Sequence, residues 1–203
     1  MPSIETLLSV VMAVLAAGCA SDGTPRDGGA DAASDADTSD SGDAGAPDGD
    51  VEPCPSGMVL IDDGEGQPFC IDRFEHPNQE GQAPTVGLPW FRAREACVEA
   101  GTAICLEEQW TRACAGTPVE ACQGLIGASG LRPECESSTG VRDMPGNVAE
   151  WTAEPGGSVT FMARGGSGED SDIGCQVREE IDAEQRDVDL GLRCCTQPRR
   201  GGR

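Results

Sequence analysis

The sequence predicts an α+β domain that is rich in disulfides and in which much of the backbone is irregular. Two segments beyond residue 53 have apolar residues at helical spacing, and the other apolar runs are short and separated by turn residues. The chain contains 28 glycines and 14 prolines, which favour turns over long helices and strands. It also contains 11 cysteines, which in an exported chain are typical of disulfides.

The N-terminal residues 1–19 are predicted to be a lipoprotein signal peptide. Residues 7–17 are apolar apart from Ser9, too few to span a bilayer as a helix, and Gly18 and Cys19 follow. A run of small residues that ends in Gly-Cys resembles a bacterial lipobox, in which the cysteine is lipidated and becomes the mature N-terminus. We therefore expect an extracytoplasmic protein, periplasmic or at the cell surface, that is anchored to a bacterial membrane through Cys19 rather than simply secreted.

Residues 20–52 are predicted to be a disordered acidic linker. They contain nine aspartates, a single basic residue, Arg26, and almost nothing that a core could bury. Residues 198–203 are expected to form a disordered tail. The whole chain carries 36 acidic and 14 basic residues, a net charge of −22, which argues against nucleic acid and anionic membrane surfaces as partners. The lipid is thus the only membrane contact that the sequence predicts.

Residues 53–197 are predicted to form one domain, and they contain every cysteine except Cys19. Their even number favours disulfides, and the absence of a Cys-x-x-Cys pair argues against a zinc knuckle or a thioredoxin-type site. The chain has no lysine or tyrosine, which excludes Schiff-base catalysis and a tyrosine acid. Its single histidine, His76, cannot complete a histidine-based metal site, and we expect it in a surface loop.

Two helices are predicted within this domain. In residues 89–100, Trp90, Ala93 and Cys97 recur at helical spacing, and Gly101 follows as a stop signal. Residues 106–115 repeat the pattern around Trp110, with two glutamates in the first turn, where the helix dipole favours negative charge. Short strands and turns are expected elsewhere.

The segment from Asp143 to Trp151 is the strongest candidate for a metal site. Asp143 and Glu150 supply carboxylates, and the carbonyls of Gly146 and Val148 can turn inward between them, so the segment offers the hard oxygen ligands that calcium prefers. The alternative is a tight turn at residues 144–147 that enters a strand with Trp151 in the core.

Five segments in the same order resemble motifs of the formylglycine-generating enzyme (sulfatase-modifying factor) family. Residues 146–151 resemble the GNxxEW signature of that family, and four other segments flank it: residues 70–75 its first strand, 90–105 and 106–114 its two helices, and 191–194 its closing GFRC. The resemblance spans residues 54–196. It implies a compact fold related to C-type lectins, with Trp90, Trp110 and Trp151 in the core.

The residues that would carry the family's catalysis are missing. Active members bind Cu(I) through two cysteines shortly after an RGGS motif, because Cu(I) favours thiolate ligands. Here residues 164–167 match RGGS, but Cys175 is the only cysteine that follows within range, and an alternative alignment makes it a structural cysteine. Copper is therefore not expected, and Cys175 is only a weak catalytic candidate.

The resemblance also implies ligands and disulfides. It assigns calcium to Asp143, Gly146, Val148 and Glu150, and it pairs Cys97 with Cys194 and Cys114 with Cys175. Expected proximity suggests the other pairs: Cys122 with Cys135, Cys54 with Cys70, and Cys105 with Cys195. Ten cysteines allow on the order of a thousand pairings, so the sequence alone does not decide between them.

The function that these observations favour is non-enzymatic. We expect a tethered domain that binds an unknown protein, peptide or glycan. The alternative is an oxidase that converts a cysteine of sulfatases to formylglycine or performs a related oxidation, in which Cys175 acts with another cysteine such as Cys195. An iron-dependent relative of the sulfoxide synthases is a weaker option, because their iron sites need several histidines.

Overall fold

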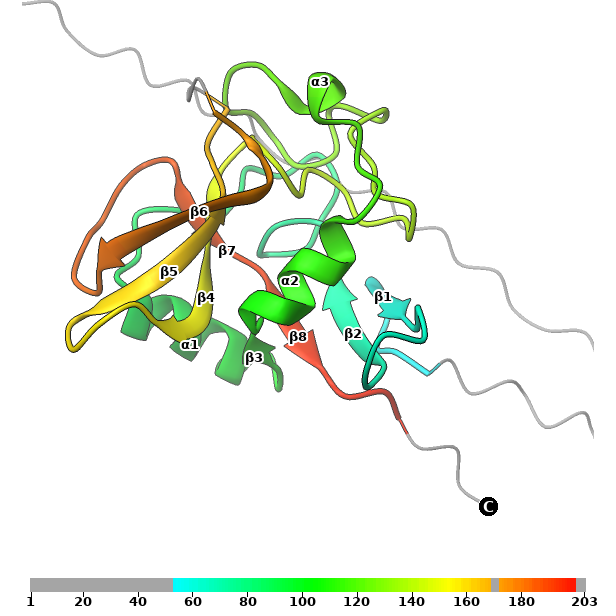
Figure 1. Cartoon of the computed structure of the whole chain (residues 1–203), viewed down its shortest axis with the longest axis horizontal. Coiled ribbons are helices and arrows are strands. Elements are labelled where there is room, and N and C mark those ends of the chain that lie inside the picture. The colour runs from blue at the N-terminus through cyan, green and yellow to red at the C-terminus, as the bar shows by residue number, and fades with distance from the viewer. Residues whose placement is uncertain (1–52, 169–171, 200–203) are drawn as a thin grey trace, which may run out of the picture. The chain divides into compact units, whose positions relative to one another are not determined.

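The computed structural model describes residues 53–168 and 172–199 of the chain. The predicted signal peptide, Cys19, the acidic linker and residues 200–203 of the tail lie outside the described residues. The described part contains two four-stranded sheets and three helices, so the predicted α+β class is confirmed (Figure 1). Within it, no helix combines the length and the hydropathy that a membrane span needs.

The first sheet joins the two ends of the domain. Its strands lie in the order β1 (Met58–Ile61), β2 (Phe69–Asp72), β8 (Cys194–Thr196) and β3 (Ala103–Ile104). All three pairings are antiparallel. The C-terminal strand β8 is therefore an inner strand, held between β2 and β3.

The second sheet has the order β6 (Gly174–Asp182), β5 (Thr160–Gly165), β4 (Ala149–Pro155) and β7 (Leu190–Leu192). The strands β6, β5 and β4 form an antiparallel meander, whereas β4 and β7 are parallel. The register shifts at a bulge between Trp151 and Pro155, and again between Arg164 and Gly165. Such bulges bend and twist a sheet.

The two predicted helices form within one residue of their expected ends. Helix α1 (Trp90–Glu99) buries Trp90, Ala93 and Cys97, which lie at the spacing that predicted it. Helix α2 (Glu107–Cys114) begins after Leu106, whose N–H group donates to the Gln109 side chain at 2.9 Å. A single turn, α3 (Val119–Cys122), follows.

The side chains form two apolar cores. One contains Trp110 of α2 together with residues of β1 and β2, and the other contains Trp90 and Trp151 between α1 and the second sheet. The exposed fractions of Trp90, Trp110 and Trp151 are 7%, 0% and 1%, which confirms the prediction that they are core residues.

Strand β8 lies between these cores. Neighbouring residues of a strand point to opposite faces, and Cys194 belongs to the second core while Cys195 belongs to the first. Each is a disulfide partner: Cys194 bonds Cys97 of α1, and Cys195 bonds Cys105 beside β3. One short strand is thus covalently joined to both halves of the domain.

Five disulfides are present, and they are the five pairs that the sequence suggested. Besides the two bridges of β8, they join Cys54 to Cys70, Cys114 to Cys175 and Cys122 to Cys135. Disulfides persist in oxidising compartments, so a domain with five of them is typical of an extracytoplasmic protein.

Candidate functional site

The predicted metal loop is a sharply turned segment that enters β4. Asp143, Gly146 and Asn147 have positive φ angles of 54°, 80° and 52°, a conformation that Gly, Asn and Asp tolerate better than other residues. Asn147 holds the loop in place, because its side chain accepts from the Gly127 N–H at 2.8 Å and donates to Glu75 at 2.7 Å. The backbone is bent at residues 145–148, and Trp151 is buried, as expected.

Glu150 forms a fully buried ion pair with Arg193. Neither side chain is exposed, and the Arg193 Nη2–Glu150 Oε1 distance is 2.8 Å. Arg193 Nε donates to both carboxylate oxygens at 3.1 Å, and the Trp110 indole N–H donates to Oε2 at 2.7 Å. The remaining donors of Arg193 reach the carbonyls of Asp72 and Arg142, each at 3.0 Å. A buried guanidinium with this many partners fixes the relative positions of β2, α2, β4 and the segment before β8.

Three further carboxylates lie around this pair. Burial raises the pKa of Asp72 to about 6, even though the Cys194 N–H and the charge of Arg193 act in the opposite direction. Burial, and to a smaller extent the nearby charge of Glu75, raise the pKa of Asp143 to about 6 as well. Desolvation raises the pKa of Glu150 as well. One buried guanidinium therefore faces four buried carboxyl groups, which favours protonation of some of them.

Within the described residues, two carboxylate oxygens of this cluster, Glu75 Oε2 and Asp143 Oδ1, have no hydrogen-bond partner, and both residues are buried. The buried hydroxyl of Ser129, the residue before Gly130, has none either. The other Asp143 oxygen accepts from the Gly130 N–H at 2.6 Å. Buried oxygens without donors are costly, so a proton or a cation between them would stabilise the domain.

The calcium ligands expected from the sequence do not all fit an ion in this arrangement. Both oxygens of Glu150 already accept from Arg193 and Trp110, so this carboxylate is not open to a cation. Asp143 retains an unpartnered oxygen. The other unpartnered carboxylate oxygen nearby belongs to Glu75, a residue that the sequence did not identify as a candidate ligand. Within residues 53–168 and 172–199, no three His, Cys, Asp or Glu side chains are grouped so that they could share a metal ion.

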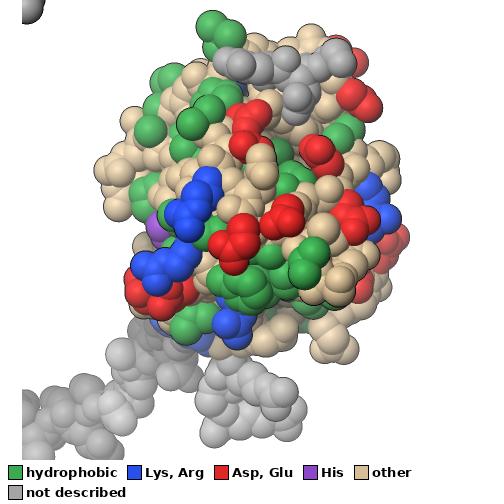
Figure 2. Space-filling view, turned by 90° about the vertical axis from the view of Figure 1, so that its left-hand side faces the viewer, with side chains coloured by type: hydrophobic (Ala, Val, Ile, Leu, Met, Phe, Trp, Pro, Cys, Tyr) green, Lys and Arg blue, Asp and Glu red, His purple; other side chains and the backbone are tan. Residues whose placement is uncertain are grey.

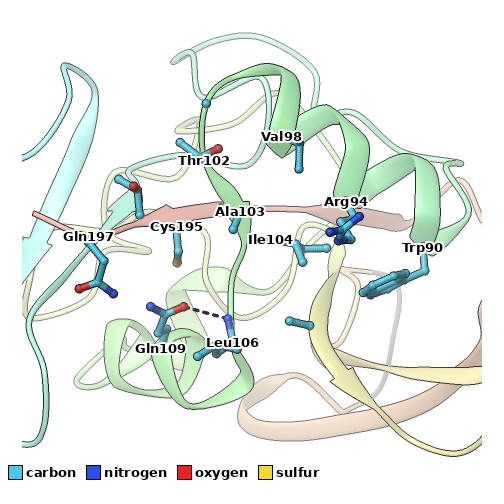
Figure 3. Close-up of a pocket in the computed structure, with 13 residues that line it drawn as sticks. Trp90, Arg94, Val98, Thr102, Ala103, Ile104, Leu106, Gln109, Cys195 and Gln197 are labelled. Carbon is cyan, nitrogen blue, oxygen red and sulfur yellow. Dashed lines mark hydrogen bonds between the residues drawn. The ribbon is translucent and has the colours of Figure 1, made fainter.

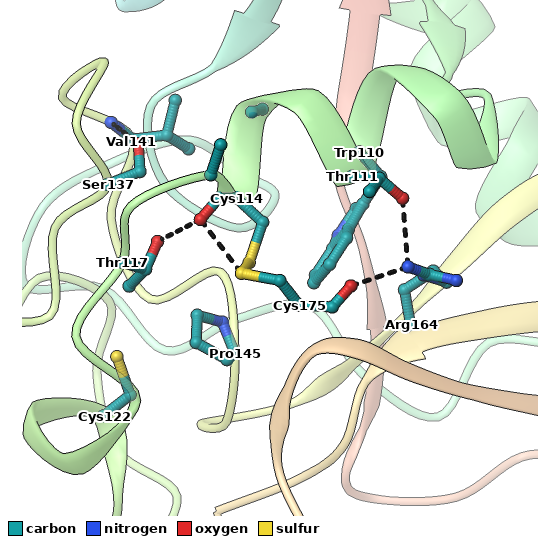
Figure 4. Close-up of a disulfide and its surroundings, with 12 residues drawn as sticks. Trp110, Thr111, Cys114, Thr117, Cys122, Ser137, Val141, Pro145, Arg164 and Cys175 are labelled. Atoms are coloured by element: carbon teal, nitrogen blue, oxygen red, sulfur yellow. Dashed lines mark hydrogen bonds between the residues drawn. A yellow bond between two sulfur atoms is a disulfide. The ribbon is translucent and has the colours of Figure 1, made fainter.

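The weak catalytic candidate, Cys175, is not a free thiol. It forms a disulfide with Cys114 at the end of α2, and Figure 4 shows this bridge next to Arg164 and Trp110. Arg164 belongs to the RGGS segment, and its guanidinium donates to the Cys175 carbonyl at 2.6 Å and to Thr111 Oγ1 at 2.9 Å. It also pairs with Glu107 at 2.7 Å. The RGGS segment thus joins β5 to α2 in this protein.

Every cysteine of the described residues is a disulfide partner. Cys195, the other cysteine of the oxidase alternative, is bonded to Cys105 and belongs to the first core, against which Cys175 packs. Since Cu(I) binding of the family type needs two thiolates, the oxidised domain offers no such site.

A hollow of about 600 Å³ lies between α1, β3 and α2 (Figure 3). Its wall includes Trp90 and Val98 of α1 together with Leu106 and Gln109. Among the described residues that line it, Arg94 is the only one with an ionisable side chain. Among the described residues that line it, none supplies a carboxylate, a histidine or a free thiol that could act as a general acid or base.

His76 lies in a turn after β2 and is partly exposed, which agrees with the expected loop position. Its backbone N–H donates to the Leu192 carbonyl at 3.0 Å, so the turn lies against β7. Its Nδ1 lies 2.9 Å from Thr85 Oγ1, and burial lowers the pKa of the ring. With Asp72 it lines a small hollow of about 200 Å³.

Comparison with solved structures defines the fold class. The U1 and M1 variants of the Major Tropism Determinant superpose with TM-scores of 0.59 and 0.58, at 15% identity over 73% of this chain. PvdO from Pseudomonas aeruginosa superposes with a TM-score of 0.50, at 13% identity over 69% of this chain and 90% of PvdO. These neighbours place the domain among C-type-lectin-like folds. At such identities the likeness concerns the fold alone.

The sequence comparisons add no family. No protein-family model matches the chain, and no curated protein matches its sequence. The chain spans 54% of the length of the Major Tropism Determinant variants, so it corresponds to about half of those proteins. The domain is thus a disulfide-rich member of the C-type-lectin-like fold class.

Proposed function

We propose that this protein is an extracytoplasmic, lipid-anchored binding module of the sulfatase-modifying-factor type that has no oxidase activity. It presents the domain beyond an acidic linker and recognises a protein, peptide or glycan. The observation that carries this proposal is the bond between Cys175 and Cys114, which occupies the one cysteine near the family's catalytic position.

Two other features support a binding role. The hollow between α1, β3 and α2 is lined, among the described residues, by no carboxylate, histidine or free thiol, and its wall combines partly exposed apolar side chains with a few polar groups, as ligand sites do. One structural neighbour is by name a determinant of tropism, and the proposal assigns a recognition role of that general kind to this chain.

A count of free thiols tests the proposal. The exported chain is alkylated without reduction, digested and analysed by mass spectrometry, and its Cu(I) stoichiometry is measured with a competing chelator. We expect no alkylated cysteine from Cys54 to Cys195 and no tight copper site. Alkylation of Cys175 together with conversion of a sulfatase-derived cysteine peptide to formylglycine would establish the oxidase alternative instead.

Lipid anchoring at Cys19 is also part of the proposal. We expect the wild-type chain to fractionate with membranes and to partition into Triton X-114, and the Cys19→Ala variant to be released in soluble form. Equal partitioning of the two chains would exclude this anchor.

Calcium remains a proposal that rests on Asp143. Its unpartnered oxygen and that of Glu75 are the carboxylate oxygens that an ion would neutralise here. Calcium would supply charge compensation to the buried cluster and would not take part in a reaction.

A further inference from the structure

A cluster of three aromatic rings lies at the surface where α1 begins. The rings of Trp90 and Phe161 stack with centroids 3.6 Å apart and planes inclined by 11°, and Phe91 meets Trp90 edge to face at 5.1 Å and 87°. Trp90 is held in place by its indole N–H, which donates to the Thr152 carbonyl at 2.7 Å. The cluster is therefore a rigid element that loses little conformational entropy when it is covered.

The cluster borders an apolar hollow of about 370 Å³. Phe91 is 56% exposed and Val159 63% exposed, and with Phe161 they form the apolar part of its wall. Val159 lies on the turn between β4 and β5, which places this apolar surface on two elements that are distant in sequence. A concave apolar surface with fixed rings is typical of the pocket that receives one anchor side chain of a partner.

The rim of this hollow is acidic. Asp182 and Glu184 line it together with Ser158 and Ala183, and Asp182 also lines the adjoining hollow of about 390 Å³ at the end of β6. Four more carboxylates line that second hollow, namely those of Glu179, Glu180, Asp187 and Asp189, and neither hollow is lined by Arg, Lys or His. On the side of the domain that Figure 2 shows, hydrophobic side chains gather beside acidic ones.

We propose that this face, which we call the aromatic–acidic face, binds a basic segment of a partner protein. An apolar or aromatic side chain of that segment enters the hollow between Phe91, Val159 and Phe161, and flanking arginines or lysines pair with Asp182 and Glu184. The exposed ring of Phe91 adds a cation–π contact to a guanidinium that lies over it. Six carboxylates around two adjoining hollows provide the charge complementarity that selects a cationic occupant.

A second copy of this chain is a poor occupant of the same face. The chain has a net charge of −22, so two copies that approach through acidic surfaces repel each other. The same net charge attracts any polycation weakly, so a test has to distinguish this face from the rest of the surface.

Two labelled peptides make that distinction, Arg-Arg-Phe-Arg-Arg and Arg-Arg-Gly-Arg-Arg, both titrated into the full oxidised chain. Binding is followed by fluorescence anisotropy at two salt concentrations and by amide chemical shifts. We expect the phenylalanine peptide to saturate and to shift the amides of Phe91, Val159 and Asp182. Since truncation of an aromatic anchor typically weakens binding by roughly tenfold or more, the glycine peptide should bind at least that much more weakly.

Matched variants separate the aromatic and acidic contributions. Phe91→Ala should weaken the phenylalanine peptide by roughly tenfold, whereas Leu125→Ala, which removes a side chain that is 76% exposed elsewhere, should leave it unchanged. The double variant Asp182→Asn/Glu184→Gln should weaken peptide binding several-fold. Its control, Glu120→Gln/Glu134→Gln, makes the same change of charge at exposed positions outside both hollows and should have a smaller effect.

Equal binding of the two peptides, or equal effects of the test and control variants, would show general charge attraction and overturn the proposal. So would concentration-dependent self-association of the chain through Phe91. This inference rests on the proposed binding role. If the peptides did not bind, the results of the thiol count and the copper titration would still stand. A free Cys175, in contrast, would refute the non-catalytic role even if the peptides bound.

Discussion

Replacement of Asp143 by Asn should make the domain more stable at pH 8. Burial and the charge of Glu75 raise the pKa of Asp143 to about 6, from 3.8 for an exposed carboxyl. The native state therefore binds more protons than the unfolded state between pH 4 and pH 6, and the free energy of unfolding falls as the pH rises through that range. The rise in the pKa of Asp143 from 3.8 to about 6 corresponds to roughly 3 kcal/mol in the free energy of unfolding.

Asn suits the site for structural reasons. Its carbonyl can accept from the Gly130 N–H as Asp143 Oδ2 does, its amide can donate toward the unpartnered oxygen of Glu75, and it tolerates the positive φ of 54°. We expect equal stability of variant and wild type near pH 4, and a gain of up to roughly 3 kcal/mol for the variant at pH 8, or about 6–12 °C in Tm. Calorimetry in chelator from pH 4 to pH 8 measures both.

Asp72 provides the control. Its pKa is also raised to about 6, but its two oxygens accept from the Asn78 amide and the Cys194 N–H, and Asn can replace only one of them. Asp72→Asn should therefore flatten the pH dependence without the same gain in stability. A wild-type Tm that rises from pH 4 to pH 7, or an Asp143→Asn variant less stable than wild type at pH 8, would refute the reasoning.

Three further predictions concern the core. Arg193→Met should cost about 3–5 kcal/mol in urea unfolding at pH 7, because it leaves Glu150 buried without its partner; the added change Glu150→Gln should recover part of this loss, and an unaffected single variant would contradict the role of the pair. Cys114→Ser/Cys175→Ser should lower stability by roughly 4 kcal/mol if the bridge acts by closing a loop of 61 residues, without any gain of copper binding, and a copper-binding variant would be the opposite result. If calcium binds at Asp143, millimolar calcium should raise the Tm of wild type more than that of Asp143→Asn, whereas a Tm that is indifferent to calcium and chelator would remove the ion from the proposal.

The parts of the fold that the sequence predicted are those set by local pattern. The spacing of Trp90, Ala93 and Cys97 defines one face of a helix, and the structure has that helix within one residue of the expected range. The tryptophans were placed correctly because a large apolar side chain in a periodic segment has few alternatives to burial. Two of the cysteine pairs, Cys97–Cys194 and Cys114–Cys175, came from the resemblance to known motifs, and the other three were suggested by expected proximity, since no local pattern decides between pairings.

The buried charge cluster was not predicted, because it is assembled from distant segments. Asp143 and Glu150 share one segment, but Glu75 and Arg193 come from two other parts of the chain, and spacing says nothing about their approach. One signal was available: Arg193 stands between Leu192 and Cys194 in an otherwise apolar run, and a charge in a buried strand requires a buried partner. The ion pair with Glu150 also explains why that carboxylate, an expected calcium ligand, is turned toward a guanidinium.

The position of β8 has a consequence for the maturation of this protein. Its two adjacent cysteines have partners 97 and 90 residues earlier in the chain, so Cys97 and Cys105 leave an export channel long before Cys194 and Cys195. An oxidase that pairs cysteines as they emerge would first join the wrong ones, for example Cys97 to Cys105. We therefore expect production of the native protein to need disulfide isomerisation as well as oxidation, and a host strain without an isomerase to accumulate scrambled forms.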